Sequence, residues 1–223
     1  MSKRAYVLVE GQTEEVFVKQ VLAPAFFARG LFLEPTILVT KYVKHGPDFK
    51  GGVLGYAQFK RDVDLLLNGT GDALVTTMLD YYRLPNDFPG MKNRPQAHPR
   101  KRVEHVEQAV EANVNAPRKF MAFLALHEFE ALLFSSDDEL PRALTHLEKR
   151  DAFIAERVEA GAPEDINETP EGAPSKRILR IFPGYRKLLH GPTIAERIGL
   201  KTIREQCPHF DDWLTRLEAY ADN

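Results

Sequence analysis

The chain has 223 residues, of which 43% are hydrophobic and 28% are charged, and its formal net charge is −2. This composition is typical of an ordinary globular protein and excludes one that coats nucleic acid through bulk positive charge. A single cysteine, Cys207, excludes an internal disulfide framework or cysteine zinc site, and no apolar run reaches the ~20 residues of a membrane span, so we expect a cytoplasmic protein without membrane contact.

The first part of the chain alternates between strand-like and helix-like patterns. In chain order, the expected elements are a strand at Ala5–Val9, a helix at Thr13–Phe27, a strand at Phe32–Thr40, a helix at Gln58–Leu67, a strand at Ala73–Leu79, a loop at Leu84–Pro99, a helix at Arg100–Asn113 and a strand at Lys119–Leu126. Pro35 in the second strand favours an edge position or a late start. Strands separated by helices indicate an α/β fold with a four-stranded, largely parallel sheet and helices on both faces.

From Glu128 onward the pattern changes to helices and loops. The expected helices are Glu128–Phe134, Glu139–Ala160, Lys176–Ile181, Tyr185–Leu189, Thr193–Ile198 and Pro208–Tyr220. No sharp linker separates this part from the sheet. We therefore expect an α/β domain over residues 1–135 and a helical extension over 136–223 that packs on the same domain.

Three predicted strands end in carboxylates. Glu10 follows the first strand, Asp80 the third, and Glu128 and Glu130 the fourth. Because ligands of open parallel sheets bind beyond the carboxyl ends of the strands, we expect these side chains to meet at one rim. Carboxylates without cysteine favour Mg²⁺ or Mn²⁺ over zinc.

Each carboxylate also has a structural explanation. Glu14 and Glu15 follow Thr13 and suit the positive end of a helix, a role that does not cover Glu10. Glu128 and Glu130 are two residues apart and would diverge on a regular helix, so we expect only one of them, Glu128, to face the site.

The segment Val7–Glu14, with Asp80 after the third strand, resembles the TOPRIM domain of topoisomerases, primases and OLD-type nucleases. More narrowly, the chain resembles a bacterial TOPRIM-like family, domain of unknown function 4276. Matching segments are Glu10–Glu14, Leu79–Pro85, His127–Ser135, Pro174–Arg177, Gly191–Leu200 and Cys207–Trp213. The resemblance implies a TOPRIM-like (Rossmann-like) fold and Mg²⁺-dependent chemistry on phosphodiester bonds.

Carried over by position, Glu10 matches the glutamate with general acid/base or metal duties, and Asp80 matches the first aspartate of the family's DxD motif. The second aspartate is replaced by Tyr82, which puts the usual two-metal arrangement in doubt. Glu14, Glu128 or Glu130 is left to supply the missing ligand.

Two basic clusters complete the predicted site. Lys176, at a helix start beside Ser175, is the candidate lysine for stabilising a reacting phosphate. Phosphate-backbone contacts are expected from Arg94, Arg100, Lys101, Arg102 and Arg177, and Arg186 and Lys187 lie further along the second cluster. Capped, solvated helices account for these basic residues equally well.

These observations leave three hypotheses open. The first is an Mg²⁺- or Mn²⁺-dependent nuclease acting on DNA or RNA, serving phage defence beside a separately encoded ATPase by analogy with other TOPRIM nucleases. The second is a catalytically silent, TOPRIM-like partner-binding subunit, which explains Tyr82 directly. The third, nucleotidyl transfer, requires a nucleotide pocket that the sequence does not reveal. Neither a P-loop nor a glycine-rich dinucleotide motif occurs.

Overall fold

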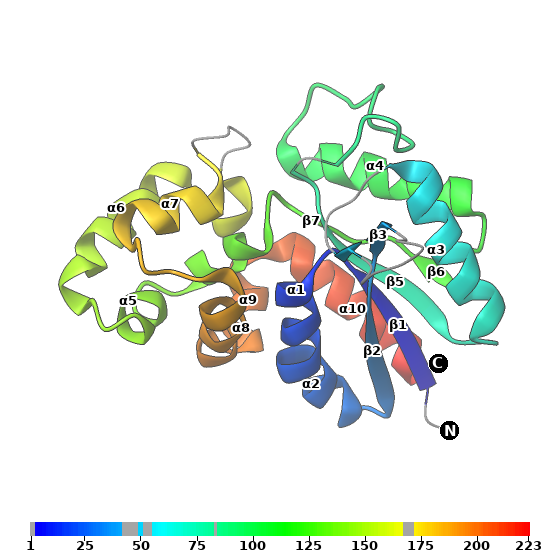
Figure 1. Cartoon of the computed structure of the whole chain (residues 1–223), viewed down its shortest axis with the longest axis horizontal. Coiled ribbons are helices and arrows are strands. Elements are labelled where there is room, and N and C mark those ends of the chain that lie inside the picture. The colour runs from blue at the N-terminus through cyan, green and yellow to red at the C-terminus, as the bar shows by residue number, and fades with distance from the viewer. Residues whose placement is uncertain (1–2, 42–48, 51–54, 83, 167–171) are drawn as a thin grey trace.

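The computed structural model describes residues 3–41, 49–50, 55–82, 84–166 and 172–223. At its centre is a parallel sheet in which β1 (Lys3–Val9) lies between β2 (Leu31–Ile37) and β5 (Leu74–Asp80). The other side of β5 pairs with two short strands, β6 (Phe120–Met121) and β7 (Leu124–Ala125). The expected α/β fold with a largely parallel sheet is confirmed (Figure 1).

The fourth predicted strand is divided between β6 and β7. At the break, the Thr77 hydroxyl accepts a hydrogen bond from Phe123 N (2.8 Å) and donates one to Phe123 O (2.7 Å). A side chain thus replaces the regular ladder for one residue, in the manner of a bulge. This contact comes from another strand and has no signature in the local sequence.

The other side of the sheet ends at β2, so the edge position that Pro35 favours is confirmed. Lys3 N donates to Gly30 O (2.9 Å), which shows that the backbone groups of even-numbered residues there point toward β1. Backbone direction alternates along a strand, so Pro35 points outward, where its missing N–H breaks no ladder bond.

The second predicted strand is shorter than expected. β2 ends at Ile37, and β3 (Val39–Lys41) leaves the main sheet to pair antiparallel with β4 (Phe49–Lys50). The expectation of one strand as far as Thr40 is therefore wrong. Leu38 N still donates to Val9 O (3.0 Å), so the chain departs from the sheet only after that bond.

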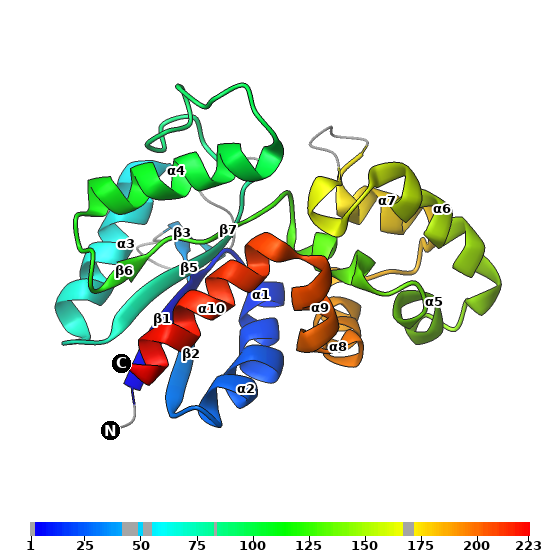
Figure 2. The same ribbon diagram turned by 180° about the vertical axis from the view of Figure 1, so that it is seen from behind.

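Helices cover both faces of the sheet. One face carries α1 (Gln12–Phe17), α2 (Ala23–Phe27) and α10 (Pro208–Asp222), and the other carries α3 (Tyr56–Gly69) and α4 (Pro99–Val114) (Figures 1 and 2). A π-helical turn, η1 (Val18–Leu22), joins α1 to α2. Successive strand residues enter opposite cores, Val7 on the α1 face and Leu8 on the α4 face.

The chain from Glu128 onward is helical, as expected, but the single helix expected over Glu139–Ala160 is interrupted after Ala143, and the two expected over Tyr185–Leu189 and Thr193–Ile198 form one helix. Its elements are η2 (Phe129–Ser135), α5 (Glu139–Ala143), η3 (Leu147–Lys149), α6 (Arg150–Ala160), η4 (Pro163–Asp165), α7 (Pro174–Ile181), α8 (Lys187–Ile198), α9 (Leu200–Gln206) and α10. Within the described part of the chain, no helix is both long and apolar enough to cross a bilayer. The division after residue 135 stays a prediction.

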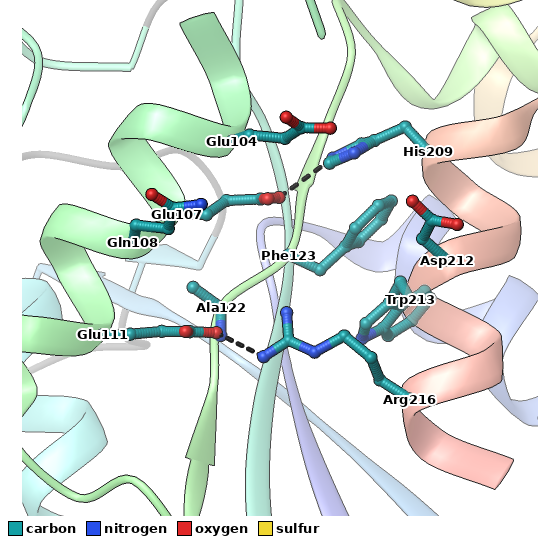
Figure 3. A pocket seen from close by; sticks show the side chains of 10 residues that line it. All are labelled: Glu104, Glu107, Gln108, Glu111, Ala122, Phe123, His209, Asp212, Trp213 and Arg216. Carbon is teal, nitrogen blue, oxygen red and sulfur yellow. Dashed lines mark hydrogen bonds and ion pairs between the residues drawn. The ribbon is translucent and has the colours of Figure 1, made fainter. Parts of the chain in front are cut away.

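The last helix, α10, returns to the sheet. Its Trp213 ring stacks on Phe123 with centroids 4.3 Å apart, and Trp213 Nε1 donates to Thr76 Oγ1 (2.9 Å). α10 and α4 flank a pocket whose floor is the β6–β7 segment (Figure 3). Across it, the ring of His209 on α10 lies 3.0 Å from Glu107 on α4.

Burial raises the pKa of Glu107, despite its bond to His209. Burial also opposes a charged His209, but its bond to Glu107 outweighs this and raises the pKa of His209. Both directions mean that the folded pair holds its shared proton more tightly than the unfolded chain does.

We therefore expect the free energy of unfolding to fall as pH rises. The stabilisation from His209 is complete below its unfolded pKa of ~6.5 and is lost as pH passes through the higher folded pKa. In His209→Gln the amide still donates to Glu107 but does not titrate, so urea denaturation should show a weaker pH dependence above about pH 6.5. Equal slopes in the variant and the wild type would contradict this assignment.

Candidate functional site

Glu10 and Asp80 lie together beyond the ends of two neighbouring strands. β1 and β5 are paired in parallel, with Val9 opposite Met78, so both strands end at the same rim of the sheet. Glu10 Oε2 accepts a hydrogen bond from Asp80 N at 3.4 Å. The structure thus brings together the two residues on which the sequence-based site depends.

Glu14 joins this pair from the first turn of α1. Its side chain is largely buried, and a Cβ on Gly11 would lie 3.3 Å from Glu14 Oε2. Glycine at position 11 therefore leaves room for the carboxylate to fold back against the strand end. Burial, and then the charge of Glu10, raise the pKa of Glu14.

Asp80 lies at the centre of the group. Its Oδ1 accepts a hydrogen bond from Phe129 N (3.1 Å), which ties the end of β5 to the start of η2. Burial, followed by the carboxylates of Glu10, Glu14 and Glu130, raises the pKa of Asp80 well above its usual value. Repulsion among several carboxylates is thus a property of the rim as a whole.

That only Glu128 of the pair would be a direct ligand stays a prediction, but Glu128 and Glu130 both reach the site, although a regular helix would make them diverge. That divergence assumes a regular α-helix, whereas Glu128 is extended and η2 is a 3-10 helix that begins at Phe129. Glu128 Oε2 accepts from Ser175 N at 3.0 Å. Glu130 is 1% exposed, and burial raises its pKa to about 7.

Lys187 is the lysine that contacts these carboxylates, whereas the sequence analysis expected Lys176 to be the lysine of the site. Lys187 Nζ lies 3.0 Å from Glu130 Oε2 and 4.0 Å from Glu128 Oε1. Burial opposes its charge, but these two carboxylates outweigh burial and raise the pKa of Lys187. Both lysines are exposed, but Lys176 lies at the first turn of α7, whereas Lys187 lies at the first turn of α8 with its ammonium beside these carboxylates.

A close approach of α8 brings Lys187 to the strand ends. A Cβ at Gly191 would lie 3.0 Å from the Phe129 ring and 3.1 Å from the Tyr185 hydroxyl. That hydroxyl donates to Glu130 Oε1 at 3.4 Å. The sequence signal that was missed is this glycine, which lies one helical turn after the lysine.

Five carboxylates therefore gather at this rim beside the ammonium group of Lys187. They come from Glu10, Glu14, Asp80, Glu128 and Glu130. Among the described residues, no three Asp, Glu, His or Cys side chains are already arranged as a metal-binding group. The rim supplies negative charge and hard oxygen donors without a closed coordination cage.

The predicted phosphate-binding residues divide into three kinds. Arg94 is exposed, and its guanidinium donates to Tyr81 Oη (2.9 Å), next to Asp80. Arg100 pairs with Glu104 and Asp212, and Lys101 pairs with Glu104. With the half-buried Arg102, these basic residues of the first turn of α4 form the second kind.

Arg177 is the third kind, because its side chain is buried, at 6% exposure, and makes contacts inside the protein. It forms an ion pair with Glu156 (2.8 Å) and donates through Nε to Gly172 O (2.9 Å). The prediction that Arg177 binds nucleic acid is not supported by this placement.

We expect Arg177→Gln to lower the free energy of unfolding by about 2 kcal/mol, because it leaves the Gly172 carbonyl without this donor and Glu156 with Arg180 as its remaining ion-pair partner. Lys176→Gln, one residue earlier and exposed, should change it by less than about 0.5 kcal/mol. Urea denaturation of the two variants measures the difference. Equal effects would show that the Arg177–Glu156 pair does not contribute to stability.

Residues 9–218 match a family model described as Domain of unknown function (DUF4276). No curated protein shows a significant match. Two solved structures of the C-terminal region of the Xanthomonas campestris pv. campestris OLD protein are similar over most of both chains. The one phased with iodine has 17% identity and a TM-score of 0.39, and covers 97% of this chain and 98% of its own. The one phased with mercury has 15% identity and a TM-score of 0.37, and covers 96% and 97%. Both TM-scores are below 0.5, so neither likeness carries an argument about function.

Proposed function

Because the chain belongs to the DUF4276 family, whose function is unknown, we propose from its own site that it is a metal-dependent nuclease that cleaves phosphodiester bonds of DNA or RNA. The observation that supports this most directly is the contact of Glu10 with Asp80 beyond the sheet, inside a group of carboxylates with one ammonium. The resemblance of Val7–Glu14 and Asp80 to the TOPRIM pattern supports the same reaction class.

The donor chemistry of the rim fits a hard cation such as Mg²⁺ or Mn²⁺. Mg²⁺ retains several waters and binds through one or two carboxylates, so a closed protein cage is not needed. Burial, and then repulsion from neighbouring carboxylates, raises the pKa values of Asp80 and Glu14, and a bound cation would relieve that repulsion. Glu10 and Asp80 would hold the ion, with Glu14 and Glu128 as further donors.

When bound, the ion would orient water and offset charge on the reacting phosphate. Glu10 would direct that water by accepting a proton from it. Lys187 would offer its ammonium to the phosphate oxygens, in place of the exposed Lys176. Glu130 is committed to Lys187 and Tyr185 and would keep the lysine in position.

Nucleic acid would approach along the side that carries Arg94, whose guanidinium donates to the hydroxyl of Tyr81, the residue that follows Asp80 in the chain. Arg100 and Lys101 have carboxylate partners, so they would contribute less to backbone binding. By resemblance to OLD-type nucleases alone, we further propose a cytoplasmic protein that acts in phage defence with a separately encoded ATPase.

Glu10→Gln and Asp80→Asn should each lower Mg²⁺- or Mn²⁺-dependent plasmid nicking or single-strand degradation at least about 100-fold, because each removes a charge that holds the ion. Glu15→Gln is the matched control. Glu15 lies on the same helix as Glu14 but pairs with Lys19 at 2.7 Å, so its loss should leave cleavage unchanged. Robust cleavage by Glu10→Gln would exclude the proposed role of Glu10.

The second candidate is a catalytically silent subunit that binds a partner. Tyr82 in place of the second DxD aspartate favours it, as does the lack of a preassembled metal group among the described residues. Titration calorimetry with Mn²⁺ separates the two proposals. The nuclease predicts heat of binding that Asp80→Asn abolishes, whereas the silent subunit predicts no heat above background.

A further inference from the structure

The turn that delivers Glu128 to the site is strained. His127 has a φ of +69° and is 1% exposed, between β7 and η2. A residue with a side chain costs about 1–3 kcal/mol in such a conformation and keeps it only when its surroundings impose it. Two bonds do so here, from Tyr82 N to His127 O (3.1 Å) and from His127 Nε2 to Glu164 O (3.1 Å).

The conformation of His127 fixes two contacts of the site. The next residue, Glu128, is extended and directs Oε2 to Ser175 N. The residue after that, Phe129, donates its backbone N–H to Asp80 Oδ1. A change of φ at His127 would rotate both groups away, because they follow it directly in the chain.

Glu164, the acceptor of the His127 ring, is itself firmly anchored. It is 7% exposed, and its carboxylate accepts from His209 N (2.8 Å) and Phe210 N (2.9 Å) in the first turn of α10. A carboxylate at this end of a helix satisfies unpaired N–H groups and interacts favourably with the helix dipole. The short η4 segment is thereby held against α10, and its carbonyl against His127.

Further buried hydrogen bonds connect Glu164, through His209, to α4 on the other side of the pocket. His209, whose N–H binds Glu164, also places its ring 3.0 Å from Glu107, and Glu107 accepts from Leu124 N at 2.7 Å (Figure 3). Leu124 begins β7, the strand that leads into His127. The buried bonds therefore run from β7 through α4 and α10 and return to the residue that follows β7.

From this series of buried hydrogen bonds we infer that Glu164 is a positioning residue of the site. It acts through His127, which it holds in the left-handed conformation that directs Glu128 to Ser175 N and the Phe129 amide to Asp80. The inference rests on the proposed function for its catalytic meaning, but its structural content is independent of any metal.

The test is a double-mutant cycle on the full chain with Glu164→Gln and His127→Asn. Glutamine keeps one of the two acceptors that cap α10, and asparagine tolerates positive φ but is too short to reach Glu164. Amide hydrogen exchange at Phe129 and Tyr82 should rise about tenfold in each variant and no further in the double variant, because both act on one turn. In cleavage assays, the Mn²⁺ concentration for half-maximal rate should rise about tenfold, with a smaller change in the rate at saturating Mn²⁺.

Arg216→Gln is the control. It breaks a different α4–α10 ion pair, that of Arg216 with Glu111 (2.7 Å), which does not lead to His127, so it should leave exchange at Phe129 and the Mn²⁺ dependence unchanged. Additive effects of the two substitutions, or unchanged exchange in Glu164→Gln, would overturn the inference. A wild-type protein without Mn²⁺-dependent cleavage would refute the proposed nuclease, while the exchange cycle would still decide the role of Glu164.

Discussion

Repulsion between carboxylates is the constraint on which the rest of the site depends. Parallel pairing of β1 with β5 forces Glu10 and Asp80 to the same rim, and burial removes the water that would screen them. Lys187 offsets only part of this charge, and its closest partner is Glu130. Burial, followed by the charges of Glu10, Glu14 and Glu130, therefore raises the pKa of Asp80 well above its usual value.

The strands of the sheet supply the carboxylates of this rim, and the segments after residue 135 supply hydrogen-bond and ion-pair partners for it. α8 contributes Lys187, α7 contributes Ser175 N, and the η4 segment contributes the Glu164 carbonyl. Gly191 allows α8 to approach closely enough for its lysine to reach Glu130. The site is therefore a product of both parts of the chain, although its acidic residues come from the first part.

The sequence predicts well whatever depends on neighbouring residues. Apolar periodicity identified the strands of the sheet, and Pro35 identified its edge. Carboxylates at strand ends were found together because parallel topology alone dictates where strand ends meet.

What the sequence could not predict depends on contacts between distant segments. The Thr77 side chain divides the fourth strand, and the 3-10 geometry of η2 turns both Glu128 and Glu130 inward. Lys187 and Lys176 look alike in a list of basic residues, and only the packing of α8 distinguishes them. For the same reason Arg177, basic and next to a helix start, is a buried partner of Glu156.

Tyr82 in place of a second aspartate is consistent with the charge already present. A carboxylate there would add a sixth acidic group to the five that gather beside Lys187, and each further buried charge raises the cost of the others. The further acidic side chains of the site instead come from Glu128 and Glu130, which follow the next strand end. The backbone of Tyr82 meanwhile holds the His127 turn that delivers Glu128. The departure from the DxD pattern thus coincides with a shift of negative charge from the end of β5 to the end of β7.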